Sequence, residues 1–478
     1  MSPALLIARD ELRLMRRNRV AIIAFAMLVL LTVAAVLTAW SHRQATAELR
    51  ARHQQAAEQA FDAQPDRHPH RVVHYGNFIY RPLSPLAAFD PGVDAFTGSS
   101  MFLEGHRQNS ANFGDVRQSS LLIRFGQLTP AFVLQAVAPL LLIFLGFGAI
   151  AREREGGTLR PLMLQGASRG EIVRGKLYAL GMVALLAALP ALLGFALIAG
   201  QPGALAAPMA VIALGYVAYL ALWTLIILLV SALVRRSRDA LLALLALWAI
   251  IVVLLPRVAP DVASAAYPLA NRLQTDVAIA RDLRAMGDSH NPDDPYFARF
   301  KASVLKRYGV KRVEDLPVNY KGLLGMEGER MTTALFDRYA TTSHDAQDRQ
   351  NALVDRIGIL SPAIALRSLS MAGAGTDFAG HRRFLEQAEA YRYDLVQRLN
   401  RLQAEAVSYS DDTAQDADAD RRKRIAADRW HDMPDFAFVP PSGATLARAA
   451  LPGLAVLLGW LLATSCLLML AARRLGAR

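Results

Sequence analysis

One stretch of this sequence nearly matches a phosphate-binding loop. Residues 170–177 read GEIVRGKL, which fits the pattern G-x-x-x-x-G-K followed by Ser or Thr except at Leu177, where the motif needs a hydroxyl for Mg²⁺. A phosphate loop also follows a strand, whereas this stretch follows a charged loop and leads into a long apolar run. We therefore expect no nucleotide site here, and interpret the same residues as the start of a helix.

A second group that could do chemistry is a set of histidines, His68, His70 and His74, in the segment HPHRVVH. Alternating histidines on an extended segment can chelate a transition metal. No cysteine or neighbouring carboxylate completes a recognised ligand spacing. We therefore favour a solvated, histidine-rich loop and expect no metal site.

Two further patterns are rejected on similar grounds. The acidic run DADAD at 416–420 imitates the start of a calcium loop, but Arg421 replaces the required glycine and Ala427 stands in place of the bidentate glutamate. We interpret it as a solvated run that pairs with the basic run RRKR at 421–424. The sequence contains no H-E-x-x-H motif, and no histidine lies in an apolar run to act as a base for Ser231. We expect no catalytic residue and no bound cofactor in this chain.

The elements that carry these residues are those of a membrane protein. Of the 478 residues, 53% are hydrophobic, the mean hydropathy is +0.24, and the apolar residues gather in long runs. A helix needs roughly 20 apolar residues to cross about 30 Å of hydrocarbon. Six runs reach or approach that length, at 20–40, 129–151, 177–200, 208–233, 240–256 and 447–472. Polar and aromatic residues within them could line a helix interface, namely Gln135, Tyr216, Tyr219 and Trp223.

The distribution of basic residues indicates the orientation of the chain. If residues 1–19, 152–176, 234–239 and 473–478 face the cytoplasm, they hold 17 Lys and Arg against 6 Asp and Glu, whereas the rest holds 36 against 35. Because positive charge gathers on the cytoplasmic side of membrane proteins, we predict that both termini are cytoplasmic. The basic excess is divided among short membrane-flanking segments, so we expect no nucleic-acid partner.

This topology leaves two large extracytoplasmic segments, 41–128 and 257–446. Cys466 is the only cysteine and lies in the last apolar run, so neither segment contains a disulfide. Few helix breakers follow Trp40, and the first span is therefore expected to continue outward as a polar helix. The stretch RVVHYGNFIY at 71–80 has a strand-like composition.

The second extracytoplasmic segment is mainly helical by its pattern. A long helix is expected to begin at a cap formed by Thr376 or Asp377. Its apolar residues recur every three or four positions and form one stripe, at Phe384, Ala388, Tyr391, Leu395, Leu399, Leu402 and Ala406. A stripe of this length needs a second helix to cover it, so we expect antiparallel helices that project from the membrane.

Two cytoplasmic segments have helical features of their own. Residues 1–19 mix leucines and arginines in a pattern typical of a helix that lies in the membrane interface. In the segment 152–176, Gly156 and Gly157 should break the helix that leaves the second span. Ser168 and Glu171 then have the spacing of a capping box, which predicts a new helix from about residue 169. A stiff, charged loop of this kind can dock into a soluble partner without crossing lipid.

This loop resembles that of a known family. Residues 153–178, EREGGTLRPLMLQGASRGEIVRGKLY, resemble the cytoplasmic loop of ABC-2-type ABC transporter permeases, which reads E-R-E-x-G-T-L, then a short helix, then S-R-x-E-I-x-x-G-K. Residues 359–392 resemble the extracytoplasmic domain of a bacterial subfamily with a large helical insertion between spans five and six. The matching loop residues, which the resemblance implies couple to an ATPase, are Glu153, Arg154, Glu155, Gly157, Thr158, Leu159, Ser168, Arg169, Glu171, Gly175 and Lys176.

The resemblance implies an all-α membrane protein with six transmembrane helices of ABC-2 permease type and a large, mainly helical extracytoplasmic domain. It implies a non-catalytic permease subunit of the bacterial inner (cytoplasmic) membrane. A separate ABC ATPase would bind ATP and Mg²⁺ and drive export or movement of the extracytoplasmic domains. A second permease subunit, identical or related, would complete a dimer in the lipid bilayer. The alternative is an envelope assembly or metal-delivery scaffold whose extracytoplasmic helices bind a protein client.

Overall fold

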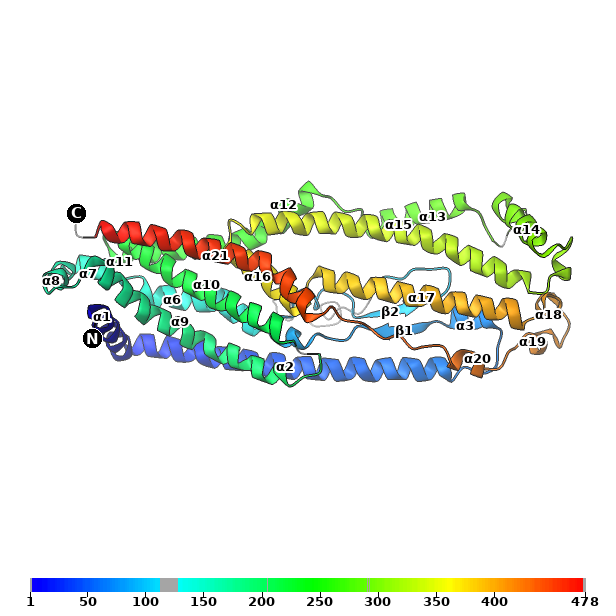
Figure 1. Ribbon diagram of the computed structural model, residues 1–478, viewed down its shortest axis with the longest axis horizontal. Helices are drawn as coiled ribbons and strands as arrows, with labels where there is room; N and C mark the ends of the chain where they lie inside the picture. The colour runs from blue at the N-terminus through cyan, green and yellow to red at the C-terminus, as the bar shows by residue number, and fades with distance from the viewer. Residues whose placement is uncertain (1, 112–127, 204, 290, 292, 476–478) are drawn as a thin grey trace.

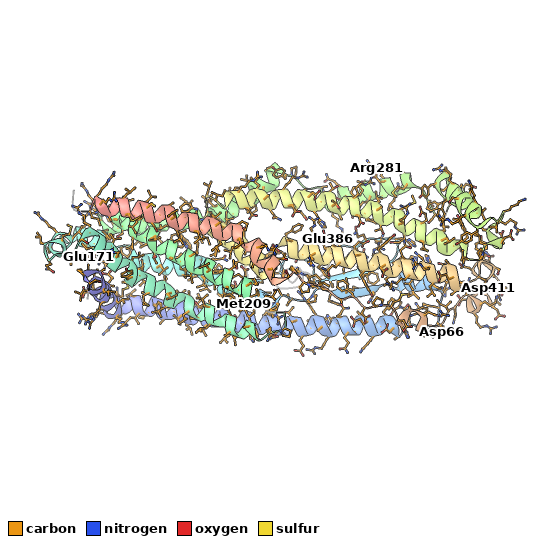
Figure 2. The ribbon with its side chains drawn as sticks, in the orientation of Figure 1. Asp66, Glu171, Met209, Arg281, Glu386 and Asp411 are labelled. Carbon is orange, nitrogen blue, oxygen red and sulfur yellow. The ribbon has the colours of Figure 1, made fainter. Side chains whose placement is uncertain are left out.

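The computed structural model describes residues 2–111, 128–203, 205–289, 291 and 293–475. The molecule is elongated and mostly helical, and both chain termini lie at one end (Figure 1). Glu171 lies at that end, whereas Asp66 and Asp411 lie at the opposite end (Figure 2). The last three residues of the predicted cytoplasmic tail 473–478, and part of the extracytoplasmic segment 41–128, lie outside the described residues.

The end that carries the termini is a helix bundle. Among the described residues, six helical segments are long and apolar enough to cross a membrane, which confirms the predicted all-α membrane fold. Two of these segments contain a π-helical turn, labelled η3 and η4. The elements of the bundle are α1 (Pro3–Arg17), α2 (Arg19–Asp62), α5 (Pro130–Phe132), η3 (Val133–Val137), α6 (Ala138–Gly146), α7 (Ala151–Glu155), α8 (Leu159–Leu164), α9 (Arg169–Ala199), α10 (Ala206–Leu233), α11 (Ser237–Trp248), η4 (Ala249–Leu254), α12 (Leu255–Ala266) and α21 (Gly443–Arg473).

The other half of the molecule contains the remaining helices and one two-stranded antiparallel sheet, in which Asn77 pairs with Leu103 and Tyr80 with Ser100. We call this half the extracytoplasmic domain, following the predicted topology. Its elements are α3 (Pro69–Tyr75), β1 (Asn77–Tyr80), η1 (Pro85–Ala88), β2 (Ser100–Leu103), α13 (Arg272–Met286), α14 (Pro295–Tyr308), η5 (Val313–Asp315), α15 (Tyr320–Ile357), α16 (Pro362–Ala374), α17 (Phe378–Ala406), α18 (Tyr409–Thr413), α19 (Ala419–Arg422) and α20 (Asp428–His431).

One continuous helix joins the two halves. The predicted outward extension of the first span is confirmed, because α2 runs for 44 residues. At 1.5 Å per residue its length is about 66 Å. Its outer part holds strand β1 in place, since Gln54 Oε1 accepts a hydrogen bond from Tyr80 N at 2.8 Å and Arg50 donates to the Arg81 carbonyl at 3.1 Å.

The predicted helix interface within the bundle is confirmed by its hydrogen bonds. Pro139 has no N–H to offer the Gln135 carbonyl one turn earlier, and the Tyr219 hydroxyl donates to that carbonyl at 2.9 Å instead. The Gln135 side-chain amide donates to the Tyr216 hydroxyl at 2.7 Å. Trp223 is fully buried and lies edge-on to Tyr219. The Tyr219 hydroxyl therefore satisfies a backbone carbonyl that lipid could not.

Helices α15 and α17 form an antiparallel pair, as predicted (Figure 1), but the apolar stripe of α17 is not covered by α15. Asp377 is the cap of α17, because its side chain accepts from Gly380 N at 2.9 Å. Thr376 does not cap the helix, and its hydroxyl donates to the Asp90 carbonyl at 3.0 Å instead. The stripe is buried against the strands and α3 at Phe384, Ala388, Leu395 and Leu399, whereas Ala406 at its end is exposed.

Helix α16 packs into the bundle, although its residues lie within the segment 257–446. It contacts α10 and α21. The Ser370 hydroxyl lies 3.0 Å from the Tyr216 hydroxyl, and Trp460 Nε1 donates to the Ile359 carbonyl at 2.8 Å. The sequence pattern alone did not indicate this contact. It ties the extracytoplasmic helix pair to two membrane helices.

The prediction of a strand at 71–80 is right only for its second half, which is β1. The first half is helix α3, which His68 caps by accepting a hydrogen bond from His70 N at 3.1 Å. Pro69 at the first helical position favours this start because its φ is already helical. The histidine segment is therefore helical and not extended.

The acidic and basic runs of the C-terminal part of the domain pair with each other, as predicted. Arg422 lies 2.5 Å from Asp416, and Arg424 lies 2.6 Å from Asp420. These groups are substantially exposed, and surface pairs of this kind contribute only about 0–1 kcal/mol each. The pairing explains the local charge balance and requires no calcium.

A buried histidine on α17 makes the stability of the domain dependent on pH. Burial, with the positive charge of Arg81 and the proximity of His344, lowers the pKa of His381 to about 4. The unfolded chain protonates near pH 6.5, so it binds more protons than the folded chain between pH 6.5 and 4. As the pH falls from 6.5 to 4, the free energy of unfolding should therefore decrease, by an amount on the order of 3 kcal/mol. Melting temperatures between pH 4 and 7 should have a smaller slope in His381→Gln, whereas an exposed control, His431→Gln, should keep the wild-type slope.

Candidate coupling site

The predicted coupling loop lies at the end of the molecule that carries both termini (Figure 1). It contains the short helices α7 and α8, with Gly156 and Gly157 after the first. Gly157 has a φ of 69°, in the left-handed region that favours glycine. The helix from the second span therefore ends at Glu155, as the two glycines predicted.

The start of α9 has the capping box that the sequence predicted. The Ser168 hydroxyl accepts from Glu171 N at 3.2 Å, and the Glu171 carboxylate accepts from Ser168 N at 2.9 Å. Residues 170–177 are consequently α-helical. They do not form the loop that would surround a phosphate, which agrees with the rejection of the nucleotide motif.

Lys176 is the centre of a buried ionic cluster at this site. Its side chain is 4% exposed, and its Nζ lies 2.5 Å from Glu11 and 2.7 Å from Glu153. Glu153 is held on its other side by Thr158, whose hydroxyl donates to the Glu153 carbonyl at 3.2 Å. One ammonium group therefore joins α1, α7 and α9, and it compensates the charges of two half-buried carboxylates.

Close backbone packing reinforces the contact between α1 and α9. A Cβ atom on Gly175 would lie 2.7 Å from the Ala4 carbonyl oxygen and 2.7 Å from the Ile7 side chain. Only glycine allows this approach. Leu5 and Leu6 on the other side of α1 are exposed, as expected of a helix with one face in the membrane interface.

A second set of contacts attaches α7 to the end of α10. The Arg154 guanidinium donates to the carbonyls of Val234 at 2.5 Å and Ala232 at 2.9 Å. The Ser231 hydroxyl accepts from the N–H groups of Ile150 and Ala151, both at 3.0 Å. Arg154 thus satisfies carbonyls that the last turn of a helix leaves without partners.

Glu155 connects the loop to the fifth span. Its carboxylate accepts from Ser237 N at 3.0 Å, at the first residue of α11. An acidic group at a helix N-terminus is stabilised by the helix dipole and by the free N–H groups there. The loop is therefore attached to the helices of spans two, three, four and five.

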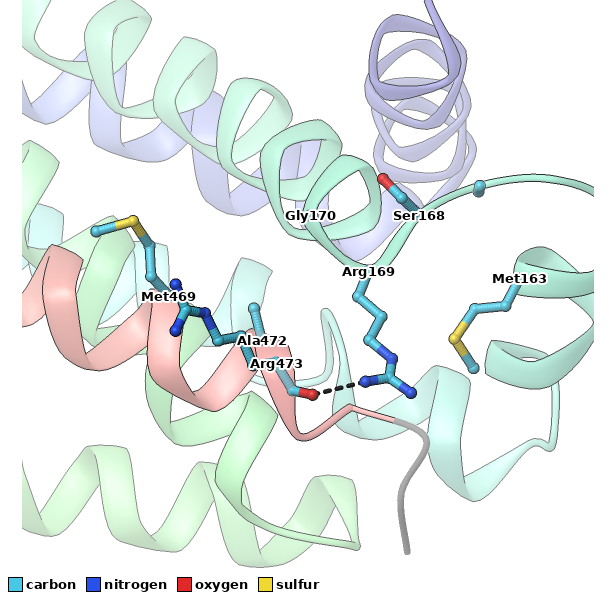
Figure 3. A pocket seen from close by; sticks show the side chains of 8 residues that line it. Met163, Ser168, Arg169, Gly170, Met469, Ala472 and Arg473 are labelled. Atoms are coloured by element: carbon cyan, nitrogen blue, oxygen red, sulfur yellow. Dashed lines mark hydrogen bonds between the residues drawn. The ribbon is translucent and has the colours of Figure 1, made fainter.

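The rest of the loop faces outward beside an open pocket of about 740 Å³ (Figure 3). The Arg169 guanidinium donates to the Arg473 carbonyl at 2.6 Å across this pocket. Met163 and Met469 line it from α8 and α21. The side chain of Leu164, at the tip of α8, is 80% exposed. Arg160, Gln165 and Arg169 are exposed as well, so Leu164 is an apolar side chain among polar and charged ones.

The eleven predicted coupling residues thus divide into two groups. One group is buried or half-buried and builds the loop, namely Glu153, Arg154, Leu159, Glu171, Gly175 and Lys176. The other is exposed, namely Glu155, Gly157, Thr158, Ser168 and Arg169, although Glu155 also binds Ser237 N and Arg169 the Arg473 carbonyl. Sequence reasoning did not single out Leu164. The signal that could have found it is the short apolar stretch PLML between glycines and charges.

Comparison with known families gives two matches. Residues 5–306 match the model of the ABC-2 family transporter protein. Residues 272–439 match a domain of unknown function, DUF3526, which covers most of the extracytoplasmic helices after the fifth span. No curated protein matches the chain.

Proposed function

The chain belongs to the ABC-2 transporter family, and from that premise we propose that it is a permease subunit whose loop at 153–176 receives movement from a separate ABC ATPase. The family match covers the first five of the six candidate spans, up to α12, and includes the whole loop. ATP and Mg²⁺ would bind to the partner, and this chain would supply no catalytic group. The observation that carries the proposal is the exposed apolar tip on a rigidly attached loop.

The division of the loop residues supports this role. A loop that transmits force must be fixed to the membrane helices on one side and available to a partner on the other. Lys176, Arg154 and Glu155 supply the first property through contacts with α1, α10 and α11. Leu164 and Arg169 are available to a partner, since both are exposed.

The assembly that we propose contains two permease subunits and two ATPase chains in the bacterial inner (cytoplasmic) membrane. The even number of candidate spans and the position of both termini at one end support a topology with both termini in the cytoplasm (Figure 1). A second permease subunit, either identical or related in sequence, would complete the dimer. Lipid covers the remaining apolar faces.

Movement at the loop has two direct routes to the extracytoplasmic domain. Helix α2 extends without interruption from the cytoplasmic end to Asp62. Helix α16 packs against both α10 and α21 and leads directly into α17. We propose that ATP-driven movement serves export or displaces this domain. A passive scaffold for an extracytoplasmic client is the competing function, and it would need no ATPase.

The docking surface is tested by placing a charge on the exposed tip. Leu164→Asp should leave folding unchanged, because the side chain is 80% exposed. Burial of a leucine at an interface contributes about 1.5–3 kcal/mol, so the ATPase should bind roughly tenfold to a hundredfold more weakly. The measurement is the amount of ATPase that co-purifies with equal amounts of permease.

The matched control is Leu273→Asp on α13, since Leu273 is 73% exposed but lies in the extracytoplasmic domain. It should retain the ATPase at the wild-type level. If no ATPase accompanies the wild-type chain, the passive scaffold is favoured. Equal recovery with Leu164→Asp and wild type would show that the partner docks elsewhere.

A further inference from the structure

Three histidines from two separate segments converge on the surface of the extracytoplasmic domain. His70 and His74 lie on α3, and His106 lies in the turn after β2. Their ring nitrogens that could bind a metal all lie within 4.8 Å of one another. The ring centroids are 4.6 Å apart for His70 and His74, and 5.6 and 5.5 Å from each of these to His106.

The helical conformation of α3 is what brings the first two together. Residues four positions apart lie on one face of a helix, and Nε2 of His70 and Nε2 of His74 are 3.1 Å apart. His68, which the sequence grouped with them, points elsewhere, with its Nε2 3.2 Å from the Asp412 carboxylate. The set is therefore different from the one expected for an extended segment.

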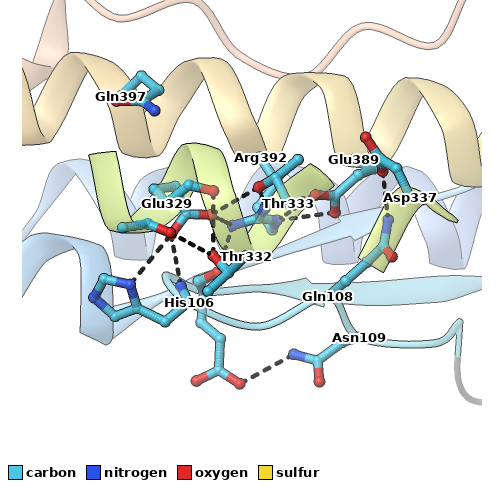
Figure 4. A network of polar contacts seen from close by, with 12 residues as sticks. His106, Gln108, Asn109, Glu329, Thr332, Thr333, Asp337, Glu389, Arg392 and Gln397 are labelled. Atoms are coloured by element: carbon cyan, nitrogen blue, oxygen red, sulfur yellow. Dashed lines mark hydrogen bonds and ion pairs between the residues drawn. The ribbon is translucent and has the colours of Figure 1, made fainter. Parts of the chain in front are cut away.

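His106 is oriented toward this pair by a buried carboxylate. Glu329 Oε2 accepts from the His106 backbone N–H at 2.8 Å and lies 3.3 Å from its ring Nδ1 (Figure 4). The other ring nitrogen, Nε2, is buried and has no hydrogen-bond partner among the described residues. His106 also has a φ of 62°, a conformation that costs free energy in a non-glycine residue and is common at functional sites.

Glu329 is itself held rigidly. It is fully buried, and its Oε1 lies 2.5 Å from the Arg392 guanidinium, which also binds Glu389 (Figure 4). A fixed carboxylate behind a histidine sets its tautomer and leaves the opposite nitrogen available to a metal ion, as is common behind metal-binding histidines.

We propose that His70, His74 and His106 bind a divalent transition metal ion of the zinc or copper class. Imidazole nitrogen is a preferred ligand of both ions. In a tetrahedral site with metal–nitrogen distances of about 2.0–2.1 Å, the nitrogens would lie about 3.3 Å apart. The 3.1 Å separation of His70 and His74 is close to that value, and the candidate ligand atom of His106 lies within 4.8 Å of both. A hydrogen bond between two imidazoles would explain the pair but not the third ring.

The site is accessible, because His74 is exposed. Three protein ligands leave one coordination position for water or for a group on another molecule. The inference does not depend on the coupling loop, which lies at the other end of the molecule (Figure 1). The proposed metal site lies entirely within the extracytoplasmic domain.

The test uses the full chain in detergent, purified without a histidine tag and freed of metal. Titration with Zn²⁺ alone in a calorimeter should give one equivalent per chain. Loss of one of three ligands should weaken binding at least a hundredfold in His74→Ala and in His106→Ala. Glu329→Gln, which acts by positioning His106, should weaken it about tenfold to a hundredfold. Co²⁺ in place of Zn²⁺ should give the visible absorption of a tetrahedral nitrogen site.

The control is His344→Ala, on α15 of the same domain, which should bind Zn²⁺ as the wild type does. His74→Ala should retain the wild-type melting temperature without metal, because the side chain is exposed. The proposal is wrong if the wild type binds no Zn²⁺, or if His74→Ala binds as tightly as His344→Ala. Neither result would bear on the attachment of the ATPase.

Discussion

Replacing Lys176 by methionine is expected to destabilise the end of the bundle that carries the termini by about 3–5 kcal/mol, the usual effect of removing one partner from a buried ion pair. The variant leaves Glu11 and Glu153 facing each other without the ammonium group that lies 2.5 and 2.7 Å from them. Two like charges would then repel in a poorly solvated position. We expect a lower melting temperature and faster proteolysis of α1, which loses its ionic link to α9.

The control for this change is Arg174→Met, two residues earlier on the same helix and exposed. It alters the charge of the loop equally but breaks no buried contact, so its melting temperature should stay within about 1–2 °C of the wild type. The double variant Glu11→Gln, Lys176→Met should recover part of the loss, because only one carboxylate then remains. Identical melting curves for Lys176→Met and Arg174→Met would contradict the role of Lys176 as the link between α1, α7 and α9.

Replacing Arg392 by methionine is expected to have a similarly large effect on the extracytoplasmic domain. The Arg392 side chain is 1% exposed and donates hydrogen bonds to Glu329, Glu389 and the Thr333 hydroxyl. Methionine fills much of the space but leaves two carboxylates buried without a cation. A loss of about 3–5 kcal/mol follows from breaking such a group. Chemical unfolding followed by circular dichroism measures it.

Arg398→Met is the matched control, because Arg398 lies on the same helix and pairs with Asp394 at 2.7 Å on the surface. It should cost no more than about 1 kcal/mol. Since Glu329 would lose the group that holds it, Arg392→Met should also weaken any Zn²⁺ binding through His106. Equal unfolding curves for the two variants would mean that the buried network does not stabilise the domain.

Much of the architecture could be predicted because it depends on local properties of the chain. Runs of apolar residues indicated the membrane helices, and the positions of Lys and Arg indicated which loops flank them. The capping box at Ser168 and Glu171, the break at Gly157 and the outward extension of α2 each depend on a few neighbouring residues. These features are confirmed by the structure. The loop motif also led to the right family.

The prediction at 71–80 was wrong in its first half for a reason that is also local. Valine, histidine and tyrosine favour strands in composition, but Pro69 and the cap at His68 start a helix. Short segments have too few residues for a clear period, so a single turn of helix and a strand look alike. That difference decided which histidines face one another.

Only the tertiary structure decided the contacts between residues that are far apart in the sequence. Lys176 meets Glu11 across 165 positions, and Arg392 meets Glu329 across 63. The convergence of His106 with α3 and the packing of α16 against α10 and α21 are of the same kind. Local patterns report how each segment interacts with water, lipid and its own backbone. They do not report which segment lies opposite, because that depends on how whole helices pack, and many partners would satisfy the same pattern.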